Sequence, residues 1–124
     1  MVRPELYFRN NVVGSLNLFE ALLSAGNPPL VFSSSCATYG LPDTMPIDEA
    51  TPQRPVNPYG ESKLAIERAL HWLDAAHALR HVALRYFNAA GADPDGEIGE
   101  RHEPETHLIP LVLGAAAGRG ERAQ

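Results

Sequence analysis

The sequence is short of cysteine, long apolar runs and basic residues, and each shortage excludes a class of protein. Its only cysteine, Cys36, cannot form an internal disulfide, so nothing requires an oxidising compartment. The longest apolar run, 108–117, is too short to span a bilayer, and charged residues interrupt the N-terminal segment where a leader peptide would need an apolar core. The formal net charge is −5, whereas nucleic-acid backbones demand clustered Lys and Arg. We therefore expect a cytoplasmic protein that binds neither membranes nor nucleic acids.

A glycine-rich phosphate-binding turn is also missing. An α/β domain that binds a dinucleotide needs such a turn between its first strand and helix, so that the backbone can approach the pyrophosphate. Gly114 and Gly118 follow an apolar helical stretch rather than a strand. The chain thus lacks the part of a dinucleotide site that holds the phosphates.

The pattern of apolar residues predicts alternating helices and strands. In the first helix Val12, Leu16, Phe19 and Leu23 recur at helical spacing, and the two strands are short, apolar and expected to be buried. Helices are expected at 6–24, 58–79 and 107–117, strands at 30–32 and 81–87, and loops at 41–58 and 89–105. This order is typical of an α/β fold with a parallel sheet, of which two strands form only a part.

The stretch from Asn57 to Lys63 (Asn-Pro-Tyr-Gly-Glu-Ser-Lys) begins the second predicted helix. Asn57 is suited to cap that helix, and Pro58 to be its first residue. Tyr59 and Lys63 lie four residues apart and so share a helix face. The lysine and the helix N-terminus would both stabilise a phenolate, whose pKa is otherwise near ~10. The pair suits a tyrosine that takes protons from alcohols, although by itself it is also typical of a solvated helix face.

Further motifs accompany this pair in a fixed order. An apolar strand runs into Ser33-Ser34-Ser35, Tyr39-Gly40 follows, and Arg85-Tyr86-Phe87-Asn88 ends the second strand. Together these motifs resemble the extended short-chain dehydrogenase/reductase superfamily, in particular its NAD-dependent epimerase/dehydratase family and, within that, the UDP-glucose 4-epimerases. The resemblance covers nearly the whole chain.

The resemblance implies part of a Rossmann-like, doubly wound parallel sheet without its glycine-rich N-terminal half or the C-terminal substrate lobe. Residues 1–88 would be the C-terminal part of the NAD-binding domain, and 89–124 the start of the substrate-binding lobe. The chain would then be a truncated gene product or a piece of a longer protein.

The resemblance also implies three catalytic residues. Tyr59 would take the proton of the sugar 4-hydroxyl while hydride passes to NAD. Lys63 would lower the pKa of Tyr59 and hold the nicotinamide ribose, and Ser35 would hydrogen-bond the same hydroxyl. For Ser35 the alternative is a turn-capping serine, and the choice among Ser33, Ser34 and Ser35 rests on the family pattern.

Four further contacts are implied by the resemblance. Asn10 and Phe87 would contact NAD, together with Ser35, Tyr59 and Lys63. Asn88 and His107 would contact the UDP-sugar substrate, together with Ser35 and Tyr59. Without the resemblance, Phe87 would be read as a core residue.

The implied activity is the NAD-dependent interconversion of UDP-glucose and UDP-galactose through a 4-keto sugar, in galactose metabolism. The isolated chain is expected to be inactive, and the full-length enzyme to be a homodimer paired through helices equivalent to the first two here. One alternative is another nucleotide-sugar epimerase or dehydratase, although Cys36-Ala37 offers no acidic pair for elimination. The other is a non-catalytic remnant.

Two histidines and two glutamates stand close together at His102, Glu103, Glu105 and His107. They lack helical spacing and cysteine neighbours, and a proline interrupts them. We therefore expect no metal site here, and favour a mobile polar loop over the substrate.

Overall fold

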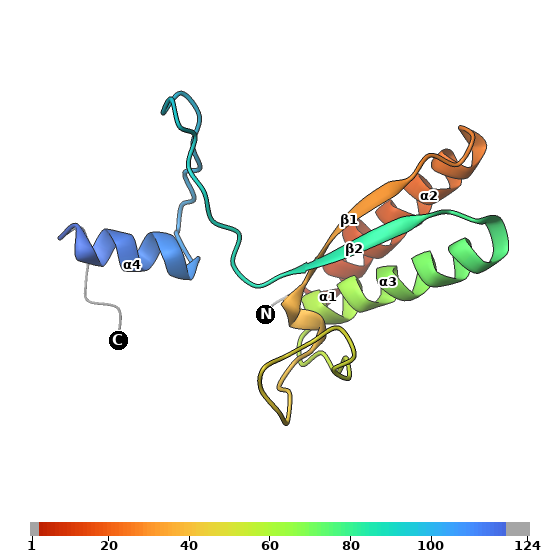
Figure 1. The fold of residues 1–124 in the computed structure, drawn as a ribbon, viewed down its shortest axis with the longest axis horizontal. Coiled ribbons are helices and arrows are strands. Elements are labelled where there is room, and N and C mark those ends of the chain that lie inside the picture. Colours follow the sequence, from red (N-terminus) through yellow and green to blue (C-terminus); the bar gives the residue numbers. More distant parts are fainter. Residues whose placement is uncertain (1–2, 119–124) are drawn as a thin grey trace. The chain divides into compact units, whose positions relative to one another are not determined.

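In the computed structural model, which describes residues 3–118, the chain begins with a helical segment in three parts. These are α1 (Pro4–Tyr7), a π-helix (Phe8–Val13) and α2 (Gly14–Ser24) (Figure 1). The prediction of one regular helix at 6–24 is wrong in two respects, because the segment begins at Pro4 and contains π turns. Phe19 is buried as predicted, but Leu16 is 40% exposed. Leu22 and Leu23 pack against the core with Phe19, and Leu16 lies beside this stripe.

The next elements form a β-α-β unit. Strand β1 (Leu30–Ser35) leads into a short 3₁₀ turn (Cys36–Thr38), helix α3 (Pro58–His77) follows a long loop, and β2 (His81–Tyr86) returns beside β1. The strands are parallel and in register, from Leu30 opposite His81 to Ser35 opposite Tyr86. The parallel sheet predicted from the sequence is confirmed. Among the described residues it has two strands.

The end of α3 comes slightly earlier than predicted. Ala78, with φ 54°, takes the left-handed conformation that closes the helix after His77, whereas the sequence predicted about Leu79. Asn27 Nδ2 donates to the carbonyl oxygens of His77 and Ala78, at 2.8 and 2.9 Å. These bonds satisfy carbonyls that a helix end leaves without a partner.

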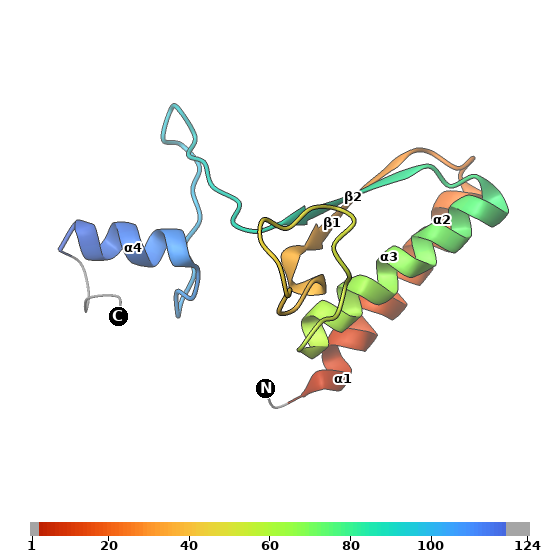
Figure 2. The same cartoon turned by 60° about the horizontal axis from the view of Figure 1, so that its bottom comes forward.

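The core lies between the sheet and two helices. Phe19 of α2, Ile66 and Leu70 of α3, and Leu79 are almost fully buried together. Figures 1 and 2 show α2 and α3 on the same face of the sheet. Among the described residues 3–87, no helix lies on the other face of the sheet (Figure 2).

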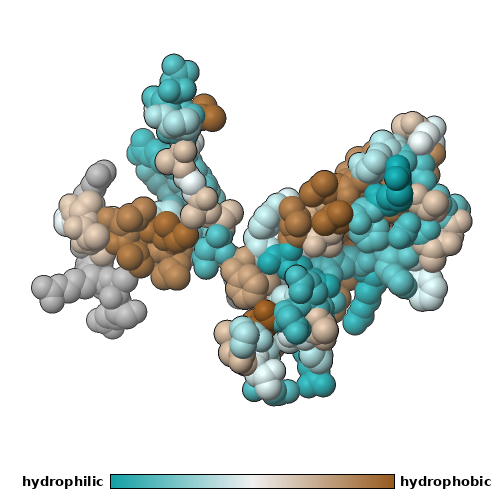
Figure 3. Space-filling view, in the orientation of Figure 1, coloured by the Kyte–Doolittle hydropathy of each residue, from teal (hydrophilic) through white to brown (hydrophobic). Residues whose placement is uncertain are grey.

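The uncovered face of the sheet corrects the prediction of two buried strands. Side chains alternate in burial along β1 and β2, and the outward ones include Val31, 67% exposed, and Val82, 56% exposed. In Figure 3 an apolar patch lies over the two strands. The sequence predicted burial on both faces because parallel strands are ordinarily covered on both. Within residues 3–87, the helices cover one face.

Residues 88–124 form a second compact unit, because they contact one another far more than they contact residues 1–87. Within it the structure describes a polar segment and α4 (Leu108–Ala116), so the predicted helix at 107–117 is confirmed within a residue at each end. The assignment of 1–88 and 89–124 to cofactor and substrate binding stays a prediction, and residues 119–124 lie outside the described part. None of the helices in 3–118 is long and apolar enough to cross a membrane.

Candidate active site

The three serines at the end of β1 have different surroundings. Ser33 is exposed, Ser34 is 4% exposed and donates its hydroxyl to Glu67, and Ser35 is half-buried. The hydroxyl oxygen of Ser35 accepts a hydrogen bond from Ala37 N at 3.2 Å, which caps the 3₁₀ turn. The Ser34 hydroxyl is therefore already engaged in the interior. Ser35 stands where the strand ends, the edge at which ligands bind in open parallel sheets.

The start of α3 is built as the sequence predicted. Asn57 Oδ1 accepts from Gly60 N at 2.8 Å, and Pro58 is the first helical residue. Gly60 lies against the turn after Ser35, since a Cβ there would collide with the carbonyl oxygen of Ala37 and lie 2.9 Å from Pro55 Cβ. Only a glycine allows this approach. It brings the first turn of α3, with Tyr59, up to the end of β1.

Tyr59 and Lys63 lie together on α3. The Lys63 Nζ atom is 5.7 Å from the centre of the Tyr59 ring and donates to the carbonyl oxygen of Ser33 at 2.9 Å. It also lies 5.0 Å from the centre of the Phe32 ring. Burial lowers the pKa of Lys63 below its usual value. The ammonium thus links the tyrosine to the serine-ended strand.

Asn10 and Asn11, in the π-helix, have different positions. Asn10, the predicted NAD contact, is exposed. Asn11 donates to the Ser62 hydroxyl at 2.9 Å, and Ser62, fully buried, donates in turn to the Tyr59 carbonyl at 2.7 Å. This chain of bonds ties the π-helix to the backbone of the candidate catalytic tyrosine. Sequence analysis missed Asn11, although the Asn10-Asn11 pair was visible.

A buried ion pair between Glu67 and Arg85 lies next to Ser34, on the interior side of β1. Arg85 of β2 donates to both carboxylate oxygens of Glu67, the shortest bond being 2.7 Å, and the Glu67 side chain is 9% exposed. Burial raises the pKa of Glu67. Hydrogen bonds from Arg85, Ser34 and Gln53 together lower it by more than burial raises it, so the net shift of the pKa is downward. The network joins α3 to the ends of both strands.

The sequence did not show that Glu67 and Arg85 form an ion pair, because the two residues lie 18 positions apart on different elements. A weak signal was available. Glu67 follows Lys63 by four residues and so continues the helix face that carries Tyr59 and Lys63.

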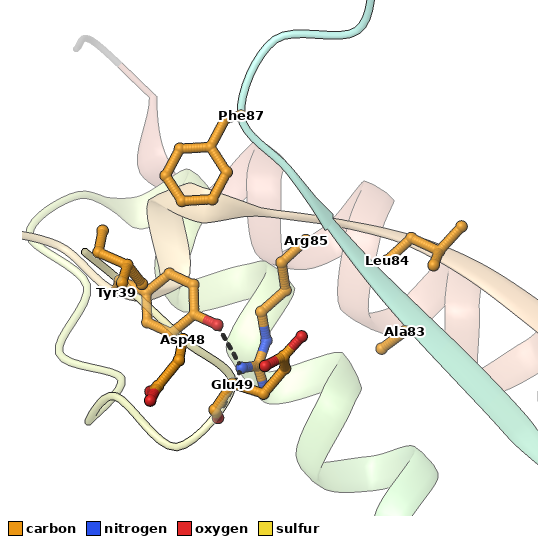
Figure 4. Close-up of a pocket in the computed structure, with 8 residues that line it drawn as sticks. Tyr39, Asp48, Glu49, Ala83, Leu84, Arg85 and Phe87 are labelled. Atoms are coloured by element: carbon orange, nitrogen blue, oxygen red, sulfur yellow. Dashed lines mark hydrogen bonds between the residues drawn. The ribbon is translucent and has the colours of Figure 1, made fainter. Parts of the chain in front are cut away.

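Phe87, the predicted nicotinamide contact, is 59% exposed and lines a cavity of about 400 Å³. Arg85 reaches across this cavity and donates to the Tyr39 hydroxyl at 2.8 Å, as Figure 4 shows. Ser35, Tyr59 and Lys63 do not line it. Thr38 and Tyr39, in and beside the 3₁₀ turn, are buried at 0% and 4% exposure.

The remaining two predicted contacts, Asn88 and His107, belong to the second unit, where both are exposed. His107 precedes α4, and its Nδ1 lies 2.8 Å from Glu105 Oε1. Within this unit the ring of His107 stacks on that of His102, with centroids 4.9 Å apart. What either residue binds stays a prediction.

A strand ending in serines, followed by a tyrosine and lysine at a helix start, is the arrangement of a short-chain reductase-type site. The chain matches the NAD dependent epimerase/dehydratase family over residues 1–122. It is 54% identical over 122 residues to a UDP-glucose 4-epimerase of Streptococcus mutans, which covers 98% of this chain and 37% of that protein. It is 57% identical over 118 residues to one of Rhizobium meliloti, covering 95% of this chain and 36% of that protein.

Comparison with solved structures gives the same family. A UDP-glucose 4-epimerase from Brucella ovis in complex with NAD superposes with a TM-score of 0.86 at 55% identity, over 94% of this chain and 36% of that one. One from Bifidobacterium longum, in complex with NAD⁺ and UDP, gives 0.80 at 37% identity, again over 94% and 36%. The chain belongs to the NAD dependent epimerase/dehydratase family. It has the fold of a central part of these Rossmann-like enzymes and spans little more than a third of their length.

Proposed function

We propose that this chain is the catalytic middle of an enzyme that interconverts UDP-glucose and UDP-galactose through a 4-keto sugar, in galactose metabolism. The observation that carries the proposal is the position of Lys63 Nζ, 2.9 Å from the Ser33 carbonyl oxygen and 5.7 Å from the Tyr59 ring centre. Family membership and relatives named UDP-glucose 4-epimerase support it.

Tyr59 is the proposed proton carrier. Its phenolate takes the proton from the sugar 4-hydroxyl and returns it after the keto sugar has rotated within the site, so one group serves both proton transfers. The ammonium of Lys63 is partly desolvated, so water screens its effect on the phenol less than at a fully exposed site. The Ser35 hydroxyl, at the end of β1, would hold the substrate oxygen against Tyr59.

The residues present fit part of a nicotinamide cofactor. Lys63 is a hydrogen-bond donor beside the candidate acid/base, and exposed Asn10 and Phe87 are available as further contacts. No glycine-rich turn in this sequence cradles a pyrophosphate. NAD, when bound, would supply the hydride acceptor and donor for the sugar carbon. The residues of this chain position the sugar hydroxyl and move its proton.

The second unit is proposed to begin the substrate-binding lobe. Asn88 and His107 are its candidate contacts to the UDP-sugar, and both side chains are exposed and polar. We also place the enzyme in the cytoplasm, consistent with its single cysteine. A homodimer is proposed through α2 and α3, because Leu18 on α2 and Trp72 on α3 are 50% and 69% exposed.

The first test uses the purified chain. Titration with NAD, followed by an assay of UDP-galactose turnover, is expected to show no measurable turnover, because the phosphate-binding turn is missing. Turnover by the isolated chain would show that the missing portion is not required.

The second test sets this chain into the Rhizobium meliloti enzyme in place of its homologous 118 residues. The chimera is expected to convert UDP-galactose to UDP-glucose, and Tyr59→Phe to lower kcat by about 10²–10⁴-fold because the proton carrier is lost. Tyr7→Phe is the matched control, since Tyr7 packs edge-on against the Tyr59 ring at 6.1 Å. A folded, NAD-binding chimera without activity would contradict the proposal, as would one that Tyr59→Phe leaves fully active.

A further inference from the structure

The polar segment 93–107 of the second unit carries the whole formal charge of the chain. It contains six acidic residues and one arginine, a net charge of 1 − 6 = −5, which equals the total for the 124 residues. The arginine, Arg101, is paired with Glu103 at 2.7 Å. The segment therefore attracts cations.

Three side chains of this segment converge. Glu100, His102 and His107 each offer one ligand atom, and these atoms all lie within 4.8 Å of one another. The two imidazole rings are nearly parallel, with an angle of 10° between them and centroids 4.9 Å apart. The lone pairs of imidazole nitrogens lie in the ring planes, so one of the two stacked rings must turn about its Cβ–Cγ bond before both nitrogens face a common centre.

A carboxylate orients one of the two imidazoles. Glu105 Oε1 lies 2.8 Å from His107 Nδ1 and also accepts from the backbone N–H of His107 at 2.8 Å. In metal sites a ligating histidine ordinarily gives its second nitrogen to a carboxylate of this kind, which fixes the ring and leaves the other nitrogen to the metal. Sequence analysis excluded a metal from the lack of helical spacing, but here the chain brings the ligands together by folding back.

We propose that Glu100, His102 and His107 bind a zinc ion, with Glu105 orienting His107. Two imidazoles and a carboxylate are a ligand set that zinc accepts, with water in the fourth position. At Zn–N and Zn–O distances of about 2.0–2.2 Å, tetrahedral ligand atoms lie roughly 3.4 Å apart. The ligand atoms, now within 4.8 Å of one another, therefore close up by at most about 1.4 Å on binding. The N-terminus of α4 beside His107 opposes a cation only weakly, because the field of a helix end is screened at an exposed site.

The site rests on its own contacts and not on the proposed function, so its test needs neither NAD nor a sugar. The full chain carrying Cys36→Ser, which removes the one thiolate able to bind zinc, is titrated with zinc chloride by calorimetry. One saturable site is expected. His102→Ala, His107→Ala and Glu100→Gln should each weaken it by at least about tenfold, and Glu105→Gln by about 10–100-fold.

The matched control is Glu103→Gln, which removes the same charge from the same segment without removing a ligand. It should change the affinity by less than about threefold. Glu105 is half-buried and the other substituted residues of this segment are exposed, and all lie outside helices and strands, so the variants should keep the circular dichroism of the parent chain. Absence of saturable binding would overturn the site. So would equal weakening by Glu103→Gln and Glu100→Gln, or binding that survives both histidine substitutions.

Discussion

Lys63 is the only lysine in the sequence, so amine-specific measurements report on it alone apart from the N-terminus. Its ammonium is partly buried and held by the Ser33 carbonyl. We expect ¹⁵N NMR of its Nζ to give a pKa below the usual 10.5, because burial disfavours the charged form. A titration at or above 10.5 would show that the amine is solvated and removed from the strand end.

Glu67 gives the fold a definite pH dependence. Because its pKa is lowered in the folded chain, the unfolded chain binds more protons below the usual value of 4.5. The stability that this carboxylate contributes is therefore complete above that value and is lost as the pH falls through the lower, folded pKa. Thermal unfolding followed at falling pH should show this loss.

Glu67→Gln should remove that pH dependence and destabilise the chain by about 1–3 kcal/mol at neutral pH, because Arg85 loses its charged partner. Glu20→Gln, on the exposed surface of α2, should leave both the stability and its pH profile unchanged. Equal pH profiles for the parent and Glu67→Gln would mean that the ion pair contributes nothing.

The candidate site was predictable where its residues lie close together in sequence. The first two turns of α3 and its N-cap carry Asn57, Tyr59 and Lys63, so capping rules and helical spacing locate these residues. Asn11 and Glu67 were missed because their partners, Ser62 and Arg85, lie on other elements. Side-chain bonds between distant elements leave no periodic pattern in a sequence.

At the scale of elements, the contact between α3 and the turn after β1 fixes where Tyr59 lies. Gly60→Ala would place a methyl group against the Ala37 carbonyl, so α3 must move away. We expect a destabilisation of about 1–3 kcal/mol in urea unfolding. In the chimera proposed above, kcat should fall more than NAD binding, because the tyrosine is displaced.

The control for that substitution is Gly14→Ala. Gly14 is also helical, in α2, and a Cβ there has nothing within 4 Å. Alanine should stabilise the helix by about 0.5–1 kcal/mol, because it restricts the unfolded chain more than glycine does. If both substitutions had the same sign, the close approach at Gly60 would not be what limits that position.

The elements themselves were largely predictable, and the errors have physical causes. The spacing of hydrophobic residues predicted α3, α4 and both strands, because each of these elements carries a continuous run or stripe of apolar side chains. The π-helix at Phe8–Val13 was missed, since its turns leave the same apolar composition as an α-helix. Exposure of Val31 and Val82 was missed because covering helices are a property of the whole sheet, not of a strand's own residues.

At the scale of the whole chain, the open face of the sheet should govern behaviour in solution. Val31 and Val82 are opposite each other in the register, and Leu84 extends the patch at 38% exposure. Contiguous apolar surface of this kind drives association, and parallel strands are seldom left open. We expect the purified chain to self-associate with rising concentration in sedimentation velocity and to bind an apolar dye.

The variant Val31→Thr with Val82→Thr keeps β-branched side chains on the strands but makes the patch polar, so it should reduce both association and dye binding. The matched control is Leu41→Thr, because Leu41 is 81% exposed but lies in the loop after the 3₁₀ turn, away from the strands. A lone exposed apolar residue contributes little to association, so this control should behave like the parent chain. A parent chain that stays monomeric, or a Leu41→Thr effect as large as that of the double variant, would show that the sheet face is not the surface that associates.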